Sequence, residues 1–168
     1  AHTGLRLLGL DLPHPILVAP TAFHRLAHPD GERATAQGAG AVGAVMVVST
    51  QASLAVEDIA AAATAPLWFQ LYMQADRAAT LHLVRRAMAA GYGALVVTVD
   101  APVSLRNREQ RAGFRLSAGV EAVNLAGLPP LPAPPPAAIG DIPLFNGALD
   151  GLPGWADLAW LRAACDLP

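Results

Sequence analysis

Polar side chains stand at the carboxyl end of each of four short apolar runs in the chain. The four groups are Pro20-Thr21-Ala22-Phe23, Ser49-Thr50-Gln51, Gln70-Leu71-Tyr72 and Thr98-Val99-Asp100. Their hydroxyl, amide, phenol and carboxylate groups can bind a polar ligand through directed hydrogen bonds and can move a proton. No comparable polar cluster stands at the starts of the runs. Four such groups together therefore predict a ligand site, whereas one alone would only mark where a strand meets water.

The apolar runs themselves have the composition of buried β-strands. They are short and rich in β-branched or aromatic residues, as buried strands are. They cover Ile16–Ala19, Val45–Val48, Leu67–Leu71 and Ala94–Val99. Ala-rich stretches of helical character separate them. This strand–helix repeat predicts a parallel α/β sheet with crossover helices, either covered on both faces or closed into a barrel.

A parallel sheet brings the carboxyl ends of its strands to one edge. Barrels and open sheets of the α/β class bind their ligands at that edge. Because side chains alternate along a strand, Gln70 and Tyr72 share one face, and so do Thr98 and Asp100. The four polar groups are therefore expected to lie near one another.

Glycine and acidic residues mark the expected helices between the strands. Glu32 stands in the first turn of one helix, Asp76 opens another, and Gly91 follows the latter as a C-terminal stop. Three further glycines fall within an Ala-rich helix, and no strand leads directly into them as a phosphate-binding loop would require. We expect these glycines to allow close helix packing; they are Gly38, Gly40 and Gly43.

Composition limits the possible functions. The chain has 168 residues, of which 54% are hydrophobic and 14% charged, so it can form one domain with a sizeable core and is not disordered. The net charge is −2, and the 11 basic residues, all Arg, are scattered, which argues against nucleic acid and anionic membranes as partners. The single cysteine, Cys165, excludes a disulfide framework and a cysteine-rich metal site.

Hydropathy indicates neither a membrane segment nor a leader. The longest apolar run, residues 38–48, is about half of the ~20 residues that a transmembrane helix needs. Residues 1–8 lack the charged start and apolar stretch of a secretory signal. We therefore expect a cytoplasmic protein with no integral membrane segment.

The strand–helix pattern stops after Asp100. Residues 101–154 hold an Arg-rich patch and then a Pro-dense tract, and so long a loop is typically a mobile lid or a disordered segment. We expect most of its arginines to be solvated, with one facing a substrate. A final amphipathic helix is predicted from Trp155 to Ala164, and residues 166–168 resemble the approach to another strand.

The spacing of two histidines and a glutamate suggests one possible metal site. His24, His28 and Glu32 are four residues apart, which would place them on one face of a continuous helix. His28 precedes Pro29, and a residue before proline is disfavoured in helical geometry. We therefore expect no metal ion to be bound here.

Several segments, in this order and spacing, resemble one enzyme family over almost the whole chain. They are Pro15–Phe23, His28-Pro29-Asp30-Gly31-Glu32, Val48-Ser49-Thr50, Trp68–Tyr72, Asp76-Arg77, Arg85-Arg86-Ala87, Gly91-Tyr92, Thr98–Pro102, Arg106–Phe114 and Trp155–Arg162. The family is that of the FMN-dependent 2-hydroxy-acid oxidases and dehydrogenases, which includes glycolate and lactate oxidases, mandelate dehydrogenase and the flavin domain of flavocytochrome b2. The resemblance implies a TIM-type (βα)8 barrel, of which residues 1–168 would form about strands one to four.

The resemblance also implies a role for each polar group. Pro20, Thr21 and Ala22 would line FMN near its N5 atom, and Ser49, Gln70 and Thr98 would hydrogen-bond the isoalloxazine edge. Tyr72 would contact the carboxylate or hydroxyl of the substrate, and Asp100 would pair with a catalytic histidine. Arg106 would clamp the substrate carboxylate, with Arg108 as the alternative, because the turn before Arg106 is one residue shorter than usual.

Other parts of the family's active site have no counterpart in these residues. The family uses a lysine, a His–Arg pair and phosphate-binding loops from the later strands, and this chain contains no lysine. The resemblance thus implies half of an FMN-binding domain, with the carboxyl-terminal half of the barrel as a partner and homo-oligomers as the assembled form. The implied activity is oxidation of an L-2-hydroxy acid to the 2-oxo acid, with this chain inactive alone. The alternative is a non-catalytic half-barrel that binds flavin or assembles with a partner. An open sheet that binds another nucleotide ranks last.

Overall fold

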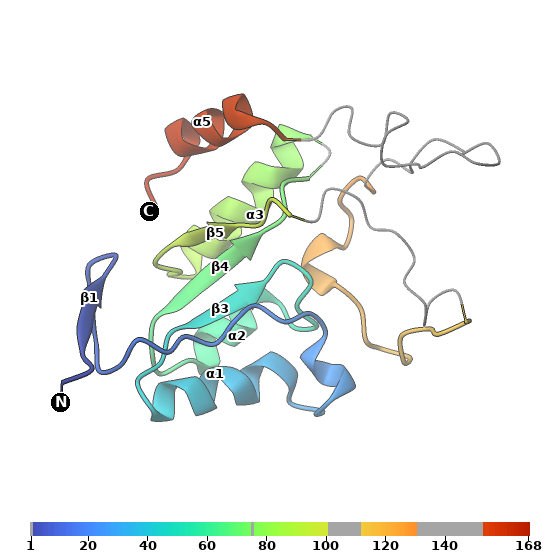
Figure 1. Ribbon diagram of the computed structural model, residues 1–168. Coiled ribbons are helices and arrows are strands. Elements are labelled where there is room, and N and C mark those ends of the chain that lie inside the picture. The colour runs from blue at the N-terminus through green and yellow to red at the C-terminus, as the bar shows by residue number, and fades with distance from the viewer. Residues whose placement is uncertain (1, 75, 101–111, 131–152) are drawn as a thin grey trace.

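The computed structural model describes residues 2–74, 76–100, 112–130 and 153–168. Its centre is a three-stranded parallel sheet in the order β3 (Met46–Ser49), β4 (Leu67–Leu71) and β5 (Leu95–Val97) (Figure 1). The predicted strands at these places are confirmed, although β5 is shorter than its apolar run. The register pairs Ser49 with Gln70 and Gln70 with Val96, so the strands end at a common edge.

The remaining predicted strand, Ile16–Ala19, which is the first along the chain, is wrong as a strand. Only Val18 pairs, through its N–H to the carbonyl of Val45 and its carbonyl to the N–H of Val47, each at 2.9 Å. Pro20 has no N–H to donate, so the ladder cannot extend past Ala19, and at the other end the N–H of Ile16 points to the His14 ring nitrogen at 3.4 Å. The segment still runs along the outer edge of β3, as a barrel neighbour would.

Helices cover one face of the sheet. These are α1 (Gly31–Ala41), α2 (Val56–Ala62) and α3 (Arg77–Ala89), and their apolar side chains form one core with Met46, Val48 and Phe69. The side chain of Asp76 accepts a hydrogen bond from the N–H of Ala79 at 2.6 Å and caps α3, as predicted.

A short hairpin, which the sequence analysis did not predict, packs on the opposite face. Strands β1 (Leu5–Leu7) and β2 (Leu10–Leu12) are antiparallel, and Leu8 and Gly9 between them both have positive φ, as in a two-residue hairpin turn. The hairpin leucines and Leu17 cover a second apolar cluster, which is made by Val45, Val47, Trp68 and Ala94. The inner face of the sheet is thus dry at the amino ends of its strands.

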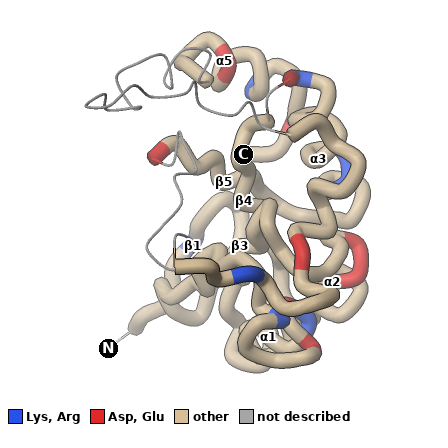
Figure 2. The backbone as a smooth tube through the Cα atoms, turned by 90° about the vertical axis from the view of Figure 1, so that its right-hand side faces the viewer, with Lys and Arg blue, Asp and Glu red and all other residues tan. Residues whose placement is uncertain are grey.

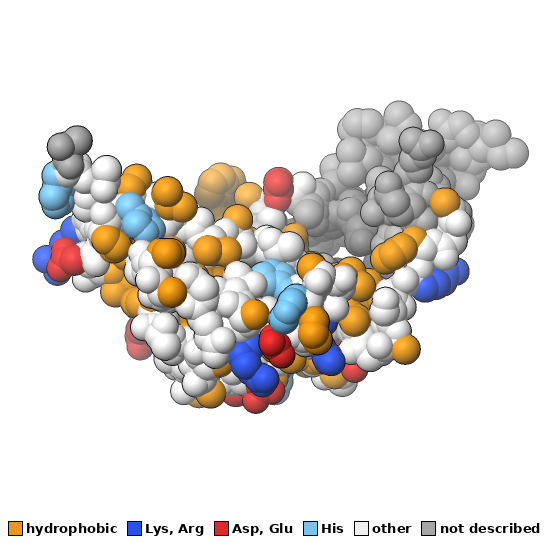
Figure 3. Space-filling view, turned by 90° about the horizontal axis from the view of Figure 1, so that it is seen from below, with side chains coloured by type: hydrophobic (Ala, Val, Ile, Leu, Met, Phe, Trp, Pro, Cys, Tyr) orange, Lys and Arg blue, Asp and Glu red, His pale blue; other side chains and the backbone are white. Residues whose placement is uncertain are grey.

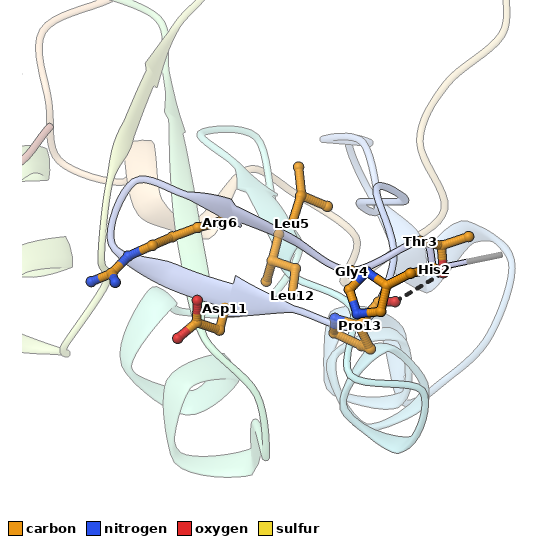
Figure 4. Close-up of a pocket in the computed structure, with 8 residues that line it drawn as sticks. All are labelled: His2, Thr3, Gly4, Leu5, Arg6, Asp11, Leu12 and Pro13. Carbon is orange, nitrogen blue, oxygen red and sulfur yellow. Dashed lines mark hydrogen bonds between the residues drawn. The ribbon is translucent and has the colours of Figure 1, made fainter.

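Figure 4 shows a pocket that the hairpin residues line. Segments 2–6 and 11–13 line the pocket, and the Thr3 hydroxyl donates to the Pro13 carbonyl at 3.1 Å within it. It lies on the hairpin, away from the carboxyl ends of β3, β4 and β5. It brings together none of the predicted site residues.

The final helix has the predicted bounds. Helix α5 runs over Trp155–Ala164, and its Leu161 joins the main core. The guanidinium of Arg77 lies 4.7 Å from the ring centre of Trp160 and donates to Asp157 at 3.0 Å, which fastens α5 to α3. Beyond α5, the carbonyl of Pro168 accepts from the N–H of Leu95 at 2.9 Å, on the outer edge of β5.

Charged residues lie on the helices, the loops and the β1–β2 hairpin rather than on the central sheet (Figure 2). Strands β3, β4 and β5 contain no charged residue. On the face seen in Figure 3, apolar side chains are scattered among polar and charged ones. None of the described helices is long and apolar enough to cross a membrane.

Candidate functional site

A chain of hydrogen bonds links the ends of β3, β4 and β5. The Ser49 hydroxyl donates to Oε1 of Gln70 at 3.3 Å, and Nε2 of Gln70 donates to the Thr98 hydroxyl at 2.9 Å. The backbone N–H of Thr50 also donates to Oε1 of Gln70, at 3.1 Å. The structure therefore brings together the three residues that the sequence analysis predicted to bind one ligand edge.

Strand alternation explains why these three side chains meet. Ser49 follows Val47 by two residues, Gln70 follows Trp68, and Thr98 follows Val96, so each continues the inner face of its strand. The N–H of Thr98 donates to the carbonyl of Leu71 at 3.1 Å, which extends the ladder one residue past β5. The inner face therefore changes from apolar to polar side chains at the carboxyl edge of the sheet. We call the three polar residues there, Ser49, Gln70 and Thr98, the polar layer Ser49–Gln70–Thr98.

The polar layer is buried and fixed in orientation. Ser49 is 5% exposed and Gln70 is 2% exposed, whereas Thr98 is half-buried at the rim. Both ends of the Gln70 amide are engaged, and a flip would turn its amide nitrogen toward the Thr50 N–H, which can only donate. The amide has a second N–H, and the Thr98 hydroxyl that accepts from it keeps a proton to donate. The layer can therefore present N–H and O–H donors to a ligand.

Thr50, which the sequence analysis named only within the group Ser49-Thr50-Gln51, holds the strand ends together. Its hydroxyl donates to the Gln70 carbonyl at 2.7 Å and accepts from the Tyr72 N–H at 3.1 Å, so it replaces ladder bonds where the strands end. Thr50 stands two residues after the predicted strand Val45–Val48 and directly after the observed β3. Through Thr50, the backbone of half-buried Tyr72 is held two residues beyond Gln70 on the same strand.

The remaining predicted residues lie around this layer or outside the described chain. Pro20 and Thr21 are exposed and Ala22 is half-buried, and the next residue, Phe23, donates its N–H to the Gln51 carbonyl at 3.2 Å. Asp100 is exposed, two residues after Thr98. Arg106 and Arg108 lie outside the described residues, as does most of the predicted lid.

The three residues considered as metal ligands lie in different elements and differ in burial. His24 lies in a 3-10 helix (His24–Leu26), His28 is exposed, and Glu32 is fully buried in α1. The His24 ring bonds the Thr35 hydroxyl at 2.9 Å, and Glu32 accepts from backbone amides and a hydroxyl. Among the described residues, no group of three or more His, Cys, Asp and Glu side chains is placed to hold a metal ion.

One described part of the long segment after Asp100 is anchored to the body. Asn124, 1% exposed, accepts at Oδ1 from the Val56 N–H at 3.1 Å and donates from Nδ2 to the Leu54 carbonyl at 3.0 Å. Arg86 donates to the same Oδ1 at 3.0 Å and binds Glu57 through two nitrogens. Residues 112–130 are therefore fastened at the start of α2.

A parallel sheet with helices on its outer face and polar residues at the carboxyl edge defines the ligand-binding end of a (βα) barrel enzyme. Residues 1–168 match the family model described as FMN-dependent dehydrogenase, and the chain belongs to that family. It is 51% identical to an L-lactate oxidase of Alicycliphilus denitrificans and 36% identical to glycolate oxidase 3 of Arabidopsis thaliana. Those alignments cover 99% and 96% of this chain but 46% and 44% of the relatives, so the chain spans about half the length of the curated relatives it matches.

Solved structures agree with this assignment. A mutant mandelate oxidase with (S)-mandelic acid is similar with a TM-score of 0.80 and 35% identity, over 99% of this chain and 43% of that one. Another structure of a mutant mandelate oxidase holds an FMN adduct, with a TM-score of 0.79. The predicted family and the TIM-type fold are confirmed, and the described strands form an open part of the barrel.

The observed edge fits the cofactor of the family. A flavin ring presents a flat face and an edge of alternating nitrogen and carbonyl groups, which a protein tunes with a few directed hydrogen bonds. The polar layer supplies an amide and two hydroxyls in fixed geometry, above the apolar layer of Val47, Trp68 and Val96. Ser49, Gln70 and Thr98 are therefore suited to the flavin edge. Residues 20–22 directly precede Phe23, whose N–H donates to the Gln51 carbonyl in the turn after β3.

Proposed function

We propose that this chain forms the flavin-edge half of an enzyme that oxidises an L-2-hydroxy acid to the 2-oxo acid, with L-lactate as the first substrate to test. The polar layer Ser49–Gln70–Thr98 carries the proposal, because it supplies directed, buried groups at the edge where barrel enzymes bind ligands. L-lactate is favoured over glycolate and mandelate because the L-lactate oxidase named above is 51% identical, against 36% and 35% for the glycolate and mandelate oxidases.

In this proposal the residues of the chain bind and orient. When bound, FMN would supply the acceptor for the α-hydrogen of the substrate and its electron pair, and a base would take the hydroxyl proton. Ser49, Gln70 and Thr98 hold the isoalloxazine edge, and the engaged Gln70 amide keeps its donor and acceptor from exchanging places. Pro20, Thr21 and Ala22 line the ring near N5.

The substrate contacts in the proposal come from residues around the polar layer. Tyr72 contacts the carboxylate or hydroxyl of the substrate, and the two donor nitrogens of Arg106 or Arg108 suit a planar carboxylate. Asp100 orients a histidine base that takes the hydroxyl proton, and stabilises the imidazolium. The 168 residues contain no lysine and no histidine after His82, so we propose that they do not turn over substrate alone.

The assembled protein in this proposal is a cytoplasmic homo-oligomer in which a complementary half closes the barrel. The outer edge of β5 supports the need for such a half. A single bond from Leu95 to Pro168 pairs it in the described chain, and parallel strands inside a barrel are paired on both sides.

The test begins with the intact mass of the purified protein, followed by FMN titration and anaerobic addition of L-lactate, glycolate and mandelate. A mass well above 17.3 kDa, or a second co-purifying fragment, with flavin absorbance that bleaches with one of these acids, supports the enzyme. Bound FMN without bleaching supports the non-catalytic half-barrel instead. Failure to bind FMN contradicts the proposal.

A further inference from the structure

The proposed chemistry does not use one fully buried carboxylate, which lies behind the loops that follow Val18 and β3. Glu32, in the first turn of α1, is 0% exposed. Its Oε1 accepts from the backbone N–H of Ser53 at 2.7 Å and from that of His24 at 3.1 Å, and its Oε2 lies 2.8 Å from the Ser53 hydroxyl. A buried acidic residue normally has a cationic partner, whereas these described partners are two amides and a hydroxyl.

Those partners belong to two separate loops at the carboxyl edge. His24 follows the segment that pairs with β3 through Val18, and Ser53 follows β3 itself. The Ser53 hydroxyl also accepts from the Arg25 N–H at 3.1 Å. One carboxylate and one hydroxyl therefore bind three backbone amides, and they join the loop after Val18 to the turn after β3.

The loop after Val18 contains a strained residue, and the hydrogen bonds of Glu32 and Ser53 hold this loop in place. Phe23 has φ +55° and ψ +50°, a left-handed conformation that a bulky residue rarely adopts. It is held on both sides, by its own N–H bonded to the Gln51 carbonyl at 3.2 Å and by the following N–H, of His24, bonded to Glu32. Strained residues persist where their surroundings fix them, and they cluster at functional sites. Release of the His24 amide would let this turn relax.

We propose that Glu32 is a positioning residue that holds the loop 20–24 against the turn 49–53 and so sets where Pro20–Ala22 and Ser49 meet the ligand. This inference rests on the proposed function for its ligand, FMN. Glu32 acts in it as a hydrogen-bond acceptor. Both backbone amides use Oε1, the Ser53 hydroxyl lies 3.0 Å from Oε1 and 2.8 Å from Oε2, and among the described residues no backbone amide uses Oε2, so glutamine can place its oxygen at the first position and donate its amide to Ser53.

The test compares Glu32→Gln, Glu32→Met and a matched control in the full chain. Asn124→Leu is the control, because Asn124 is equally buried and also holds a loop to a helix start through backbone groups, but away from the polar layer. Amide hydrogen exchange is measured for residues 21–27, 51–53 and 54–57, and FMN affinity is measured by quenching of flavin fluorescence.

For Glu32→Met we expect at least tenfold faster exchange at His24 and Ser53 and at least tenfold weaker FMN binding. Glu32→Gln should stay within about threefold of the wild type in both measurements. Asn124→Leu should speed exchange at residues 54–57 and leave FMN affinity within about threefold. Unchanged exchange at His24 in Glu32→Met, or equal FMN losses in Glu32→Met and Asn124→Leu, would overturn the inference.

Two other results, a wild type that does not bind FMN and a Glu32→Met variant that does not fold, can be told apart from failure of the inference. If the wild type does not bind FMN, the proposed function fails, and the exchange comparison still decides whether Glu32 holds the two loops. If Glu32→Met does not fold, Ser53→Ala replaces it, because this change removes the acceptor of the Arg25 N–H and the hydroxyl at Oε2. Faster exchange at Arg25 then supports the clamp, and unchanged exchange there overturns it.

Discussion

The Gln70 side-chain amide donates to the Thr98 hydroxyl across β4 and β5 at 2.9 Å, while its oxygen accepts from Ser49 and Thr50 on β3 and the turn that follows it. One side chain therefore connects all three strands at their carboxyl ends. Because the Thr50 N–H can only donate, it holds the amide oxygen of Gln70 toward β3 and the amide nitrogen toward Thr98 before any ligand arrives. Such preorganisation avoids reorientation of the groups on binding.

Gln70→Leu should weaken both the fold and FMN binding. The change leaves the buried Thr50 N–H without its acceptor, which costs about 1–3 kcal/mol in the free energy of unfolding. FMN affinity should fall at least tenfold in a fluorescence titration. Gln37→Leu, at an exposed position on α1, is the control and should change neither quantity appreciably. Wild-type FMN affinity in Gln70→Leu would contradict the proposed role of the polar layer.

Two glycines of α1 should respond to alanine in opposite directions. A Cβ at Gly40 would overlap the Thr64 hydroxyl, so Gly40→Ala should lower the unfolding free energy by about 1–3 kcal/mol. A Cβ at Gly38 would meet nothing within 4 Å, so Gly38→Ala should raise it by up to about 1 kcal/mol through helix propensity. Urea unfolding measures both, and Thr64→Ala should recover part of the Gly40→Ala loss. Equal effects of the two alanines would show that Gly40 is not a close-packing position.

The Arg86–Glu57 pair should add a pH-dependent contribution to stability. Arg86 donates to both Glu57 oxygens, at 2.7 and 2.8 Å, and this hydrogen bonding lowers the pKa of Glu57 below its usual 4.5 despite partial burial. A lowered folded-state pKa means that the contribution is fully present above the unfolded pKa and is lost as pH falls through the folded one. Solvent screens half-exposed Glu57, so we expect about 0.5–1 kcal/mol.

Glu57→Gln should therefore be less stable than the wild type at pH 7 and should lose less stability between pH 5 and pH 3. Thermal unfolding across this range is the measurement. Asp58→Asn, at an exposed position next to Glu57 on α2, is the control. Parallel pH profiles for Glu57→Gln and the wild type would show that the pair contributes nothing.

Arg77→Met should loosen α5 from α3. It removes the guanidinium that lies 4.7 Å from the Trp160 ring centre, a contact worth about 0.5–1 kcal/mol at an exposed site. Amides of residues 158–164 should exchange several-fold faster, and those of β3 should be unaffected. Arg85→Met, on an exposed part of α3, serves as the control. No change in α5 exchange would mean that Leu161 and its core contacts alone hold the helix.

Local patterns predicted the elements whose signals are local. Apolar runs located β3, β4 and β5, and alternation placed Gln70 and Thr98 where their side chains meet. The strand at residues 16–19 was over-predicted, because its apolar composition was given more weight than Pro20, which lacks the N–H that would pair next after Val18. The hairpin was missed although Leu5 and Leu7 alternate with charge-bearing Arg6 beside a Leu8-Gly9 turn, because its strands have only three residues each.

Long-range partners could not be predicted in the same way. Glu32 was expected only as an acidic residue in a first helical turn, since its burial depends on Ser53, 21 residues away. The roles of Tyr72 and Asp100 toward a substrate stay predictions, and Arg106 lies outside the described residues. Residue type indicated what these groups can do, and only the fold determines what each one faces.

The bond from Leu95 to Pro168 has a consequence for the order in which this chain folds. The contacts of the polar layer close loops of only 21 and 28 residues, whereas the outer side of β5 pairs with residues much farther along the chain. Shorter loops cost less entropy to close. We therefore expect pulse-labelled exchange to protect β3 and β4 before the Leu95 amide, so that the ligand edge is assembled during folding before the last neighbour of β5 arrives.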